Sequence, residues 1–253
     1  MDSLTKSLIA LACVFGAALL GMFWRTRVPG EYQASESKDV VRLVMGLVVT
    51  TVAIALGLLV GSAKNFYDTQ NGEMAQLAGD YVLLDRMLAQ YGPEANSTRA
   101  ALRSVLDHQI QTEEQLLGTN EVYSNIKSGA TVGESIVEKI HMLSPNDDDQ
   151  RFFKQQSLNL EVQLEQLRWL MYAQNMVPFP GFLLVMLVAW LIVLFVSFGI
   201  FAPRNPLVLA GFLASSLAIC GSILLILQMY HPQRGLIHVS DAPLRAALQQ
   251  LGR

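Results

Sequence analysis

The sequence predicts an all-α membrane protein, with four transmembrane helices and a helical extramembrane bundle between the second and the third. Two observations predict this fold class. Hydrophobic residues make up 52% of the 253 residues, charged residues make up 15%, and the mean hydropathy is +0.35. Four hydrophobic stretches are also long enough to cross a bilayer, which takes about 20 apolar residues. A soluble globular fold is therefore disfavoured.

Two of the hydrophobic stretches precede a polar segment and two follow it. They cover residues 4–24, 40–63, 179–201 and 206–230. The first stretch is too long for the apolar core of a signal peptide, and Trp24-Arg25-Thr26-Arg27 is a poor cleavage site, so we expect a retained span. We divide the chain into a first helix pair (1–63), a helical extramembrane domain (64–177), a second helix pair (178–231) and a C-terminal tail (232–253).

The polar segment has the hydrophobic periodicity of packed helices. No helix breaker separates Val40 from Tyr91, so we expect the second span to continue as one long helix that stops before Gly92-Pro93. A second helix is expected over residues 96–117, a short one near 132–142, and a third opened by Ser144-Pro145. Their predicted inward residues are Met74, Leu77, Tyr81, Leu84, Leu88 and Tyr91, then Leu102, Val105, Leu106 and Ile110, then Phe153, Leu160, Leu164, Leu167 and Met171.

Composition and motifs disfavour several classes of function. The formal net charge is -3 and the pI is near 5.8, so no basic face is available for nucleic acid. No nucleophile elbow, Walker-type loop or His-Glu-x-x-His pattern occurs in the sequence. Cys13 and Cys220 lie inside spans, where a thiol usually packs. We therefore predict no catalytic residue and no cofactor.

Three consecutive carboxylates invite a metal interpretation. Asp147, Asp148 and Asp149 could offer the hard oxygen ligands that calcium prefers. No glycine-spaced loop and no distant bidentate glutamate follow them, however. Acidic residues in the first turn of a helix also complement the positive end of its dipole, and we favour this structural role over a metal site.

The second span has one face that is small or polar from end to end. At about 100° per residue its members fall within an arc of roughly 100°. The small residues could serve close helix packing, or they could line a narrow water-filled path around a symmetry axis. The basic ends suggest anions, but Asp39 and Asp68 lie on the same face. These candidate pore-lining residues, called the stripe below, are Arg42, Gly46, Thr50, Ala53, Gly57, Gly61 and Lys64. A similar small face on the fourth span comprises Gly211, Ser215, Ala218 and Ser222.

Several short motifs together resemble one family. The motifs are Gly61-Ser62-Ala63-Lys64, Leu83-Leu84-Asp85-Arg86, Tyr91-Gly92-Pro93-Glu94, Arg168-Trp169-Leu170, Phe198-Gly199-Ile200-Phe201-Ala202-Pro203-Arg204-Asn205 and Pro243-Leu244-Arg245-Ala246-Ala247-Leu248. As a set they resemble the bestrophin-like family of bacterial membrane proteins, and the likeness covers the chain from about Val40 onwards. Relatives tend to place acids near Gln228 and Tyr230, and this chain departs from them there.

The resemblance implies a comparison with bestrophins, which are pentameric anion channels with a pore-lining second span and a helical cytosolic domain. By this likeness we expect a homo-oligomer, a pentamer, in contact with membrane lipid and a permeating ion. The expected location is the inner membrane, crossed several times, with the extramembrane domain in the cytoplasm. Basic residues near the span ends do not decide the orientation, because five lie on each side.

Three hypotheses remain open. The first is a homo-oligomeric ion channel, in which the stripe of the second span faces a central axis. The second is a non-conducting membrane scaffold or sensor whose helical domain recruits a partner, with the stripe buried between spans of one subunit. The third is a membrane enzyme, for which the sequence displays no chemistry.

Overall fold

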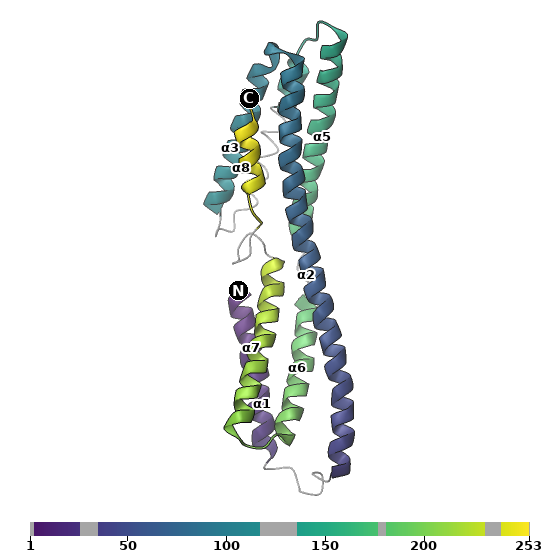
Figure 1. The fold of residues 1–253 in the computed structure, drawn as a ribbon, viewed down its shortest axis with the longest axis vertical. Helices are drawn as coiled ribbons and strands as arrows, with labels where there is room; N and C mark the ends of the chain where they lie inside the picture. Colours follow the sequence, from purple (N-terminus) through teal and green to yellow (C-terminus); the bar gives the residue numbers. More distant parts are fainter. Residues whose placement is uncertain (1–2, 26–34, 117–135, 177–180, 231–238, 253) are drawn as a thin grey trace. The chain divides into compact units, whose positions relative to one another are not determined.

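The protein is all-helical in the part of the chain that the structure describes. The computed structural model describes residues 3–25, 35–116, 136–176, 181–230 and 239–252, and no strand occurs among them. Residues 136–142 are helical in addition to the named elements. These are α1 (Ser3–Trp24), α2 (Ser35–Tyr91), the 3-10 turn η3 (Pro93–Ala95), α3 (Asn96–Leu116), α5 (Asp148–Met176), α6 (Gly181–Phe201), α7 (Pro206–Met229) and α8 (Ala242–Gln250), shown in Figure 1.

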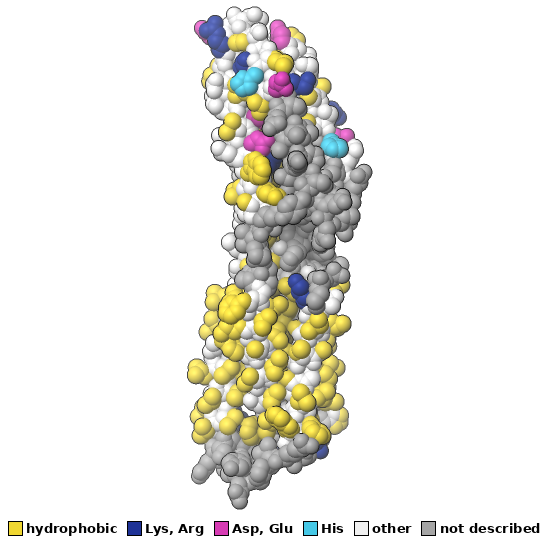
Figure 2. All heavy atoms as spheres, turned by 180° about the vertical axis from the view of Figure 1, so that it is seen from behind, with side chains coloured by type: hydrophobic (Ala, Val, Ile, Leu, Met, Phe, Trp, Pro, Cys, Tyr) yellow, Lys and Arg dark blue, Asp and Glu magenta, His cyan; other side chains and the backbone are white. Residues whose placement is uncertain are grey.

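Four of these helices, α1, α2, α6 and α7, are long and apolar enough to cross a membrane, which confirms the four predicted spans. Their surface is covered by hydrophobic side chains (Figure 2, yellow). Leu43, Phe182 and Leu207 are each more than 70% exposed. A surface of this kind suits hydrocarbon rather than water, so the chain is a membrane protein.

The helices form two compact units. The first comprises residues 1–66 and 178–237, and the second comprises residues 67–177 and 238–253. Helix α2 contributes to both. Its 57 residues run without a break, which confirms the predicted continuous helix. It ends at Tyr91 because Gly92 has a φ of 125° and Pro93 follows.

Close contact between small residues joins α1 to α6 in the first unit. A Cβ atom on Gly21 would collide with the carbonyl oxygen of Val196 and would lie 3.0 Å from the Cα atom of Gly199. The backbones can approach this far only because both positions are glycine. Val14 and Ala18 of α1 are buried in the same contact region. Gly21 and Gly199 are thus packing residues.

The second unit has one hydrophobic core shared by α2, α3, α5, α8 and residues 136–142. The predicted inward positions are confirmed: most are fully buried, and Met74, Val105, Phe153 and Met171 pack against the core while partly exposed. Helix α8 adds Leu244, Ala247 and Leu251 to this core. Residues 242–250, which we had assigned to a tail, therefore belong to the second unit.

The start of α5 differs from the prediction. The helix begins at Asp148, not at Ser144-Pro145. Asp147 precedes it, and its Oδ1 accepts a hydrogen bond from the backbone N of Gln150 at 2.7 Å. Asp147 is thus the N-cap residue, with Asp148 and Asp149 in the first turn. Capping by the aspartate prevails over a proline at the first helical position.

Candidate functional site: the outward face of α2

All seven residues of the α2 stripe are exposed in the structure. The residues of α2 that pack against the other spans lie on a different face, where Val52, Leu59 and Ala63 are buried. At 100° per residue this packing face is centred about 140° around the helix from Gly57. The stripe therefore points away from α1, α6 and α7, and it is not buried between spans of the chain.

The stripe glycines have open space beyond them. No atom outside the helix would lie within 4 Å of a Cβ atom added at Gly46, Gly57 or Gly61. Gly21 and Gly199 are the internal comparison, because a Cβ atom at either would collide with backbone of the facing helix. Where glycine serves the packing of two spans within this chain, the backbone of the facing helix thus lies directly against it. The stripe makes no such contact among the described residues.

The polar members of the stripe sit at its ends and its middle. The hydroxyl of Thr50 donates to the carbonyl oxygen of Leu47 at 2.8 Å, so it is turned onto its own helix. Arg42 lies 3.9 Å from Asp39 in a pair whose side chains are 84% and 70% exposed. Such an exposed pair contributes little to stability. Lys64 is exposed at the other end of the stripe.

Tyr230 fixes the end of α7 against α2. Its hydroxyl lies 2.9 Å from the Ser62 hydroxyl, and its ring stacks on Phe66 with 5.2 Å between the centroids. Gln228, two residues earlier, is buried. The sequence marked both positions only as departures from relatives. Tyrosine followed by His231-Pro232 at a span end was the available signal for an anchoring aromatic residue.

The small face of α7 is also turned outward. Gly211, Ser215 and Ala218 are exposed and Ser222 is half-buried. A Cβ atom at Gly211 would meet nothing within 4 Å. The first unit therefore carries two small-residue faces that its own helices leave uncovered.

The acidic cluster is not arranged as a metal centre. Among the residues described, no group of three or more His, Cys, Asp or Glu side chains could hold a metal ion. Asp147 caps α5, and Asp148 pairs with Arg151 at 2.8 Å. Both contacts belong to the first turn of the helix.

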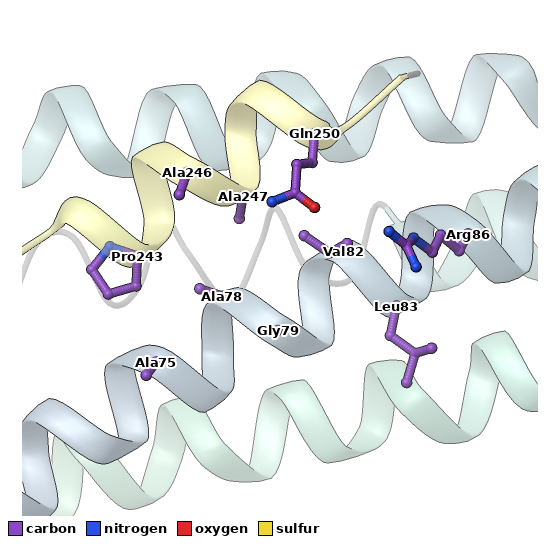
Figure 3. Close-up of a pocket in the computed structure, with 10 residues that line it drawn as sticks. All are labelled: Ala75, Ala78, Gly79, Val82, Leu83, Arg86, Pro243, Ala246, Ala247 and Gln250. Atoms are coloured by element: carbon purple, nitrogen blue, oxygen red, sulfur yellow. The ribbon is translucent and has the colours of Figure 1, made fainter.

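A shallow groove of about 460 Å³ lies between α2 and α8 in the second unit. Figure 3 shows the small side chains of Ala75, Ala78 and Ala246 along it, with Pro243 toward one end and Arg86 toward the other. The groove is largely apolar, and it contains no pair of groups suited to acid–base chemistry.

The bestrophin-like domain family matches residues 12–244, which is nearly the whole chain. The chain belongs to the bestrophin-like family. No curated protein and no solved structure matches it. Within this bestrophin-like protein, the candidate functional residues are those of the α2 stripe, because they are exposed in the part of the chain that the structure describes.

Proposed function

We propose that this bestrophin-like protein is a homo-oligomeric ion channel whose pore is lined by the α2 stripe. The observation that carries the proposal is that a small, partly polar face of a membrane span is not covered by the described residues of the chain that bears it. Family membership supports the same function, because bestrophins are channels.

A lipid-facing role explains the stripe poorly. The same helix exposes Leu43, Leu47 and Leu58, which are suited to hydrocarbon. A stripe with three glycines, a threonine and a cation at each end offers little to lipid. Small residues in spans favour close approach of another helix, and exposed backbone and hydroxyl groups favour water. Whether another helix or water covers the stripe, we expect it to come from outside this subunit.

A ring of identical subunits supplies that cover. In a cyclic oligomer each copy presents the same face to the axis and the same flanks to its neighbours. We propose a pentamer, by the family likeness. We also propose that the domain of residues 64–177 is cytoplasmic, and that the protein resides in the inner membrane. Arg42 and Lys64 slightly favour anions, although Asp39 and Asp68 share their face.

Flux through reconstituted liposomes tests the proposal. Gly57→Leu places a branched side chain where the pore would be, and we expect it to abolish flux while leaving the oligomer intact. Gly221→Leu is the matched control: Gly221 is an exposed glycine of α7 with nothing within 4 Å, and it lies off the small face of that helix. Normal flux in assembled Gly57→Leu protein would take the pore away from α2.

Selectivity provides a second test of the same site. Lys64→Glu would place one negative charge per subunit at the end of the stripe, and we expect permeability to shift towards cations. Unchanged selectivity would place Lys64 away from the path. Light scattering of the detergent-purified protein tests assembly. A protein that is monomeric in this measurement would refute the channel hypothesis as well.

A second candidate function is a non-conducting scaffold or sensor whose helical domain recruits a partner. The groove between α2 and α8 favours it, because it is an open surface of the second unit. This function predicts an assembled protein that shows no flux with any ion, which the liposome experiment distinguishes.

A further inference from the structure

A polar cluster lies inside the core of the second unit. Its central residue is Glu161 of α5, which is fully buried. Neither carboxylate oxygen of Glu161 has a hydrogen-bond partner among the described residues, and the buried hydroxyl of Ser157, one turn earlier, has none either. Buried polar atoms nearly always have partners, so this group of exceptions calls for an explanation.

Arg168 of α5 is the cation nearest to Glu161, and it is shared among three groups. Its Nη1 atom lies 3.9 Å from Glu161 and 3.6 Å from Glu165, without a hydrogen bond to either. Its Nη2 atom donates to the hydroxyl of Tyr81 on α2. The guanidinium group also lies 5.4 Å from the centre of the Tyr81 ring. Arg168 thus holds α5 to α2 and has one donor nitrogen uncommitted.

The contact continues onto a third helix. The Tyr81 hydroxyl accepts from Arg168 and donates to Oε1 of Gln109 on α3 at 3.1 Å. Tyr81 is fully buried. A change in the position of Arg168 would therefore alter contacts of α2 and α3 as well as of α5.

The surroundings of Glu161 allow its carboxyl group to be either protonated or ionised near neutral pH. Burial raises its pKa to about 7, although Arg168 acts to lower it and the like charge of Glu165 acts to raise it. The groups that face this cluster from the packed helices are Tyr81 of α2 and the neutral Gln109 of α3. The charged side chains acting on Glu161 are thus those of α5 itself.

We propose that Glu161 is a proton-binding site whose ionisation draws Nη1 of Arg168 towards Glu161, so that the packing of α5 on α2 responds to pH. Because Nη1 lies 3.9 Å from Glu161, the guanidinium group must move to form this bond, and the movement strains the contact of Nη2 with Tyr81. In the structure Arg168 bonds Tyr81 and lies 3.6 Å from Glu165 without a hydrogen bond to Glu161, a geometry that suits a neutral Glu161. When Glu161 loses its proton, a buried carboxylate 3.9 Å from an uncommitted N–H group draws that group into a charge-assisted hydrogen bond. The proposal stands whether or not the protein conducts ions.

Infrared difference spectroscopy of the full chain tests the titration directly. We expect the band of a protonated carboxyl group to be present below neutral pH and to disappear with a midpoint near 7. Glu161→Gln should remove this transition. Glu165→Gln is the matched control, because Glu165 contacts the same arginine from a half-exposed position and should leave the transition in place with a lower midpoint.

Hydrogen exchange tests the structural consequence. In the wild-type chain we expect the exchange of α2 amides around Tyr81 to change between about pH 6 and pH 8, after correction for intrinsic rates, since these values bracket the pKa by one unit. In Glu161→Gln it should stay constant. The proposal would be overturned if the wild-type carboxyl band titrated near the ordinary glutamate pKa of about 4.5. It would also be overturned if the band that titrates near 7 persisted in Glu161→Gln. Packing around Tyr81 that does not change with pH would contradict it as well. The wild-type measurement is decisive even if a variant fails to assemble.

Discussion

The ion pair between Asp85 and Arg99 offers a sharp test of how the second unit is held together. The Nε and Nη2 atoms of Arg99 donate to the two carboxylate oxygens of Asp85, each at 2.8 Å. The carboxylate also accepts from the backbone N of Gly252 at 3.2 Å. The side chains of Asp85 and Arg99 are 4% and 15% exposed. One carboxylate thus joins α2 to α3 and to the segment that follows α8.

Asp85→Asn should destabilise the protein by about 3 kcal/mol, because removing one member of a buried ion pair leaves the other charge uncompensated. This destabilisation lies at the lower end of the range for breaking a buried ion pair, since asparagine keeps the size of the side chain and one acceptor oxygen. A weaker contact with Gly252 should also loosen the last residues of the C-terminal segment, although the buried Leu251 and the bond from Arg103 to its carbonyl oxygen still hold that segment.

Denaturant unfolding of the full chain in detergent measures the loss, and limited proteolysis reports on the C-terminal segment. Asp148→Asn is the matched control, because Asp148 and Arg151 also lie 2.8 Å apart but are 93% and 64% exposed. It should cost less than about 1 kcal/mol. Equal losses in the two variants, or wild-type stability in Asp85→Asn, would refute the argument that burial gives this pair its importance.

Three further predictions concern stability. Leu84→Ala and Leu88→Ala should each cost about 2–5 kcal/mol in denaturant unfolding, because both side chains are fully buried in the core; wild-type stability in both would mean that this core is not formed. Gly21→Ala should disrupt the α1–α6 contact and lower the unfolding temperature, whereas Gly16→Ala, with open space around it, should not. Stability should fall by up to about 3 kcal/mol as pH rises from about 4.5 to about 7, because the buried Glu161 keeps a proton that the unfolded chain has released; the Glu161→Gln variant should lack this slope.

The sequence predicted the helices well because their signals are local. Hydrophobic length marked the four spans, and the spacing of Leu77, Tyr81 and Leu84 marked the inward face of α2. The start of α5 was misplaced because Ser144-Pro145 and Asp147 are both good helix starts, and only the bond from Gln150 to Asp147 distinguishes them. Local rules that compete within three residues cannot be ranked without the tertiary structure.

The polar cluster could not be predicted, because its members are far apart in the sequence. Tyr81, Gln109 and Arg168 come from three helices, and Glu161 sits next to Leu160 in a helix rich in polar residues. Arg168 was noted only as part of a family motif. A single sequence does not say that a glutamate between Leu160 and Val162 is turned inward.

The openness of the α2 stripe follows from the structure and not from its periodicity. The pattern of small residues on α2 resembles the one that brings α1 against α6, and periodicity alone favours packing without excluding a pore. The family motifs sharpen the contrast, because residues in each of them have a structural role within one chain. Gly199 packs on Gly21, Asp85 binds Arg99, Gly92 ends α2, and Ala63 and Leu244 are buried. The stripe glycines have no comparable contact among the residues that the structure describes. Their explanation must therefore lie in what surrounds the chain, and the Gly57→Leu and Gly221→Leu pair asks whether that surrounding is a water-filled axis.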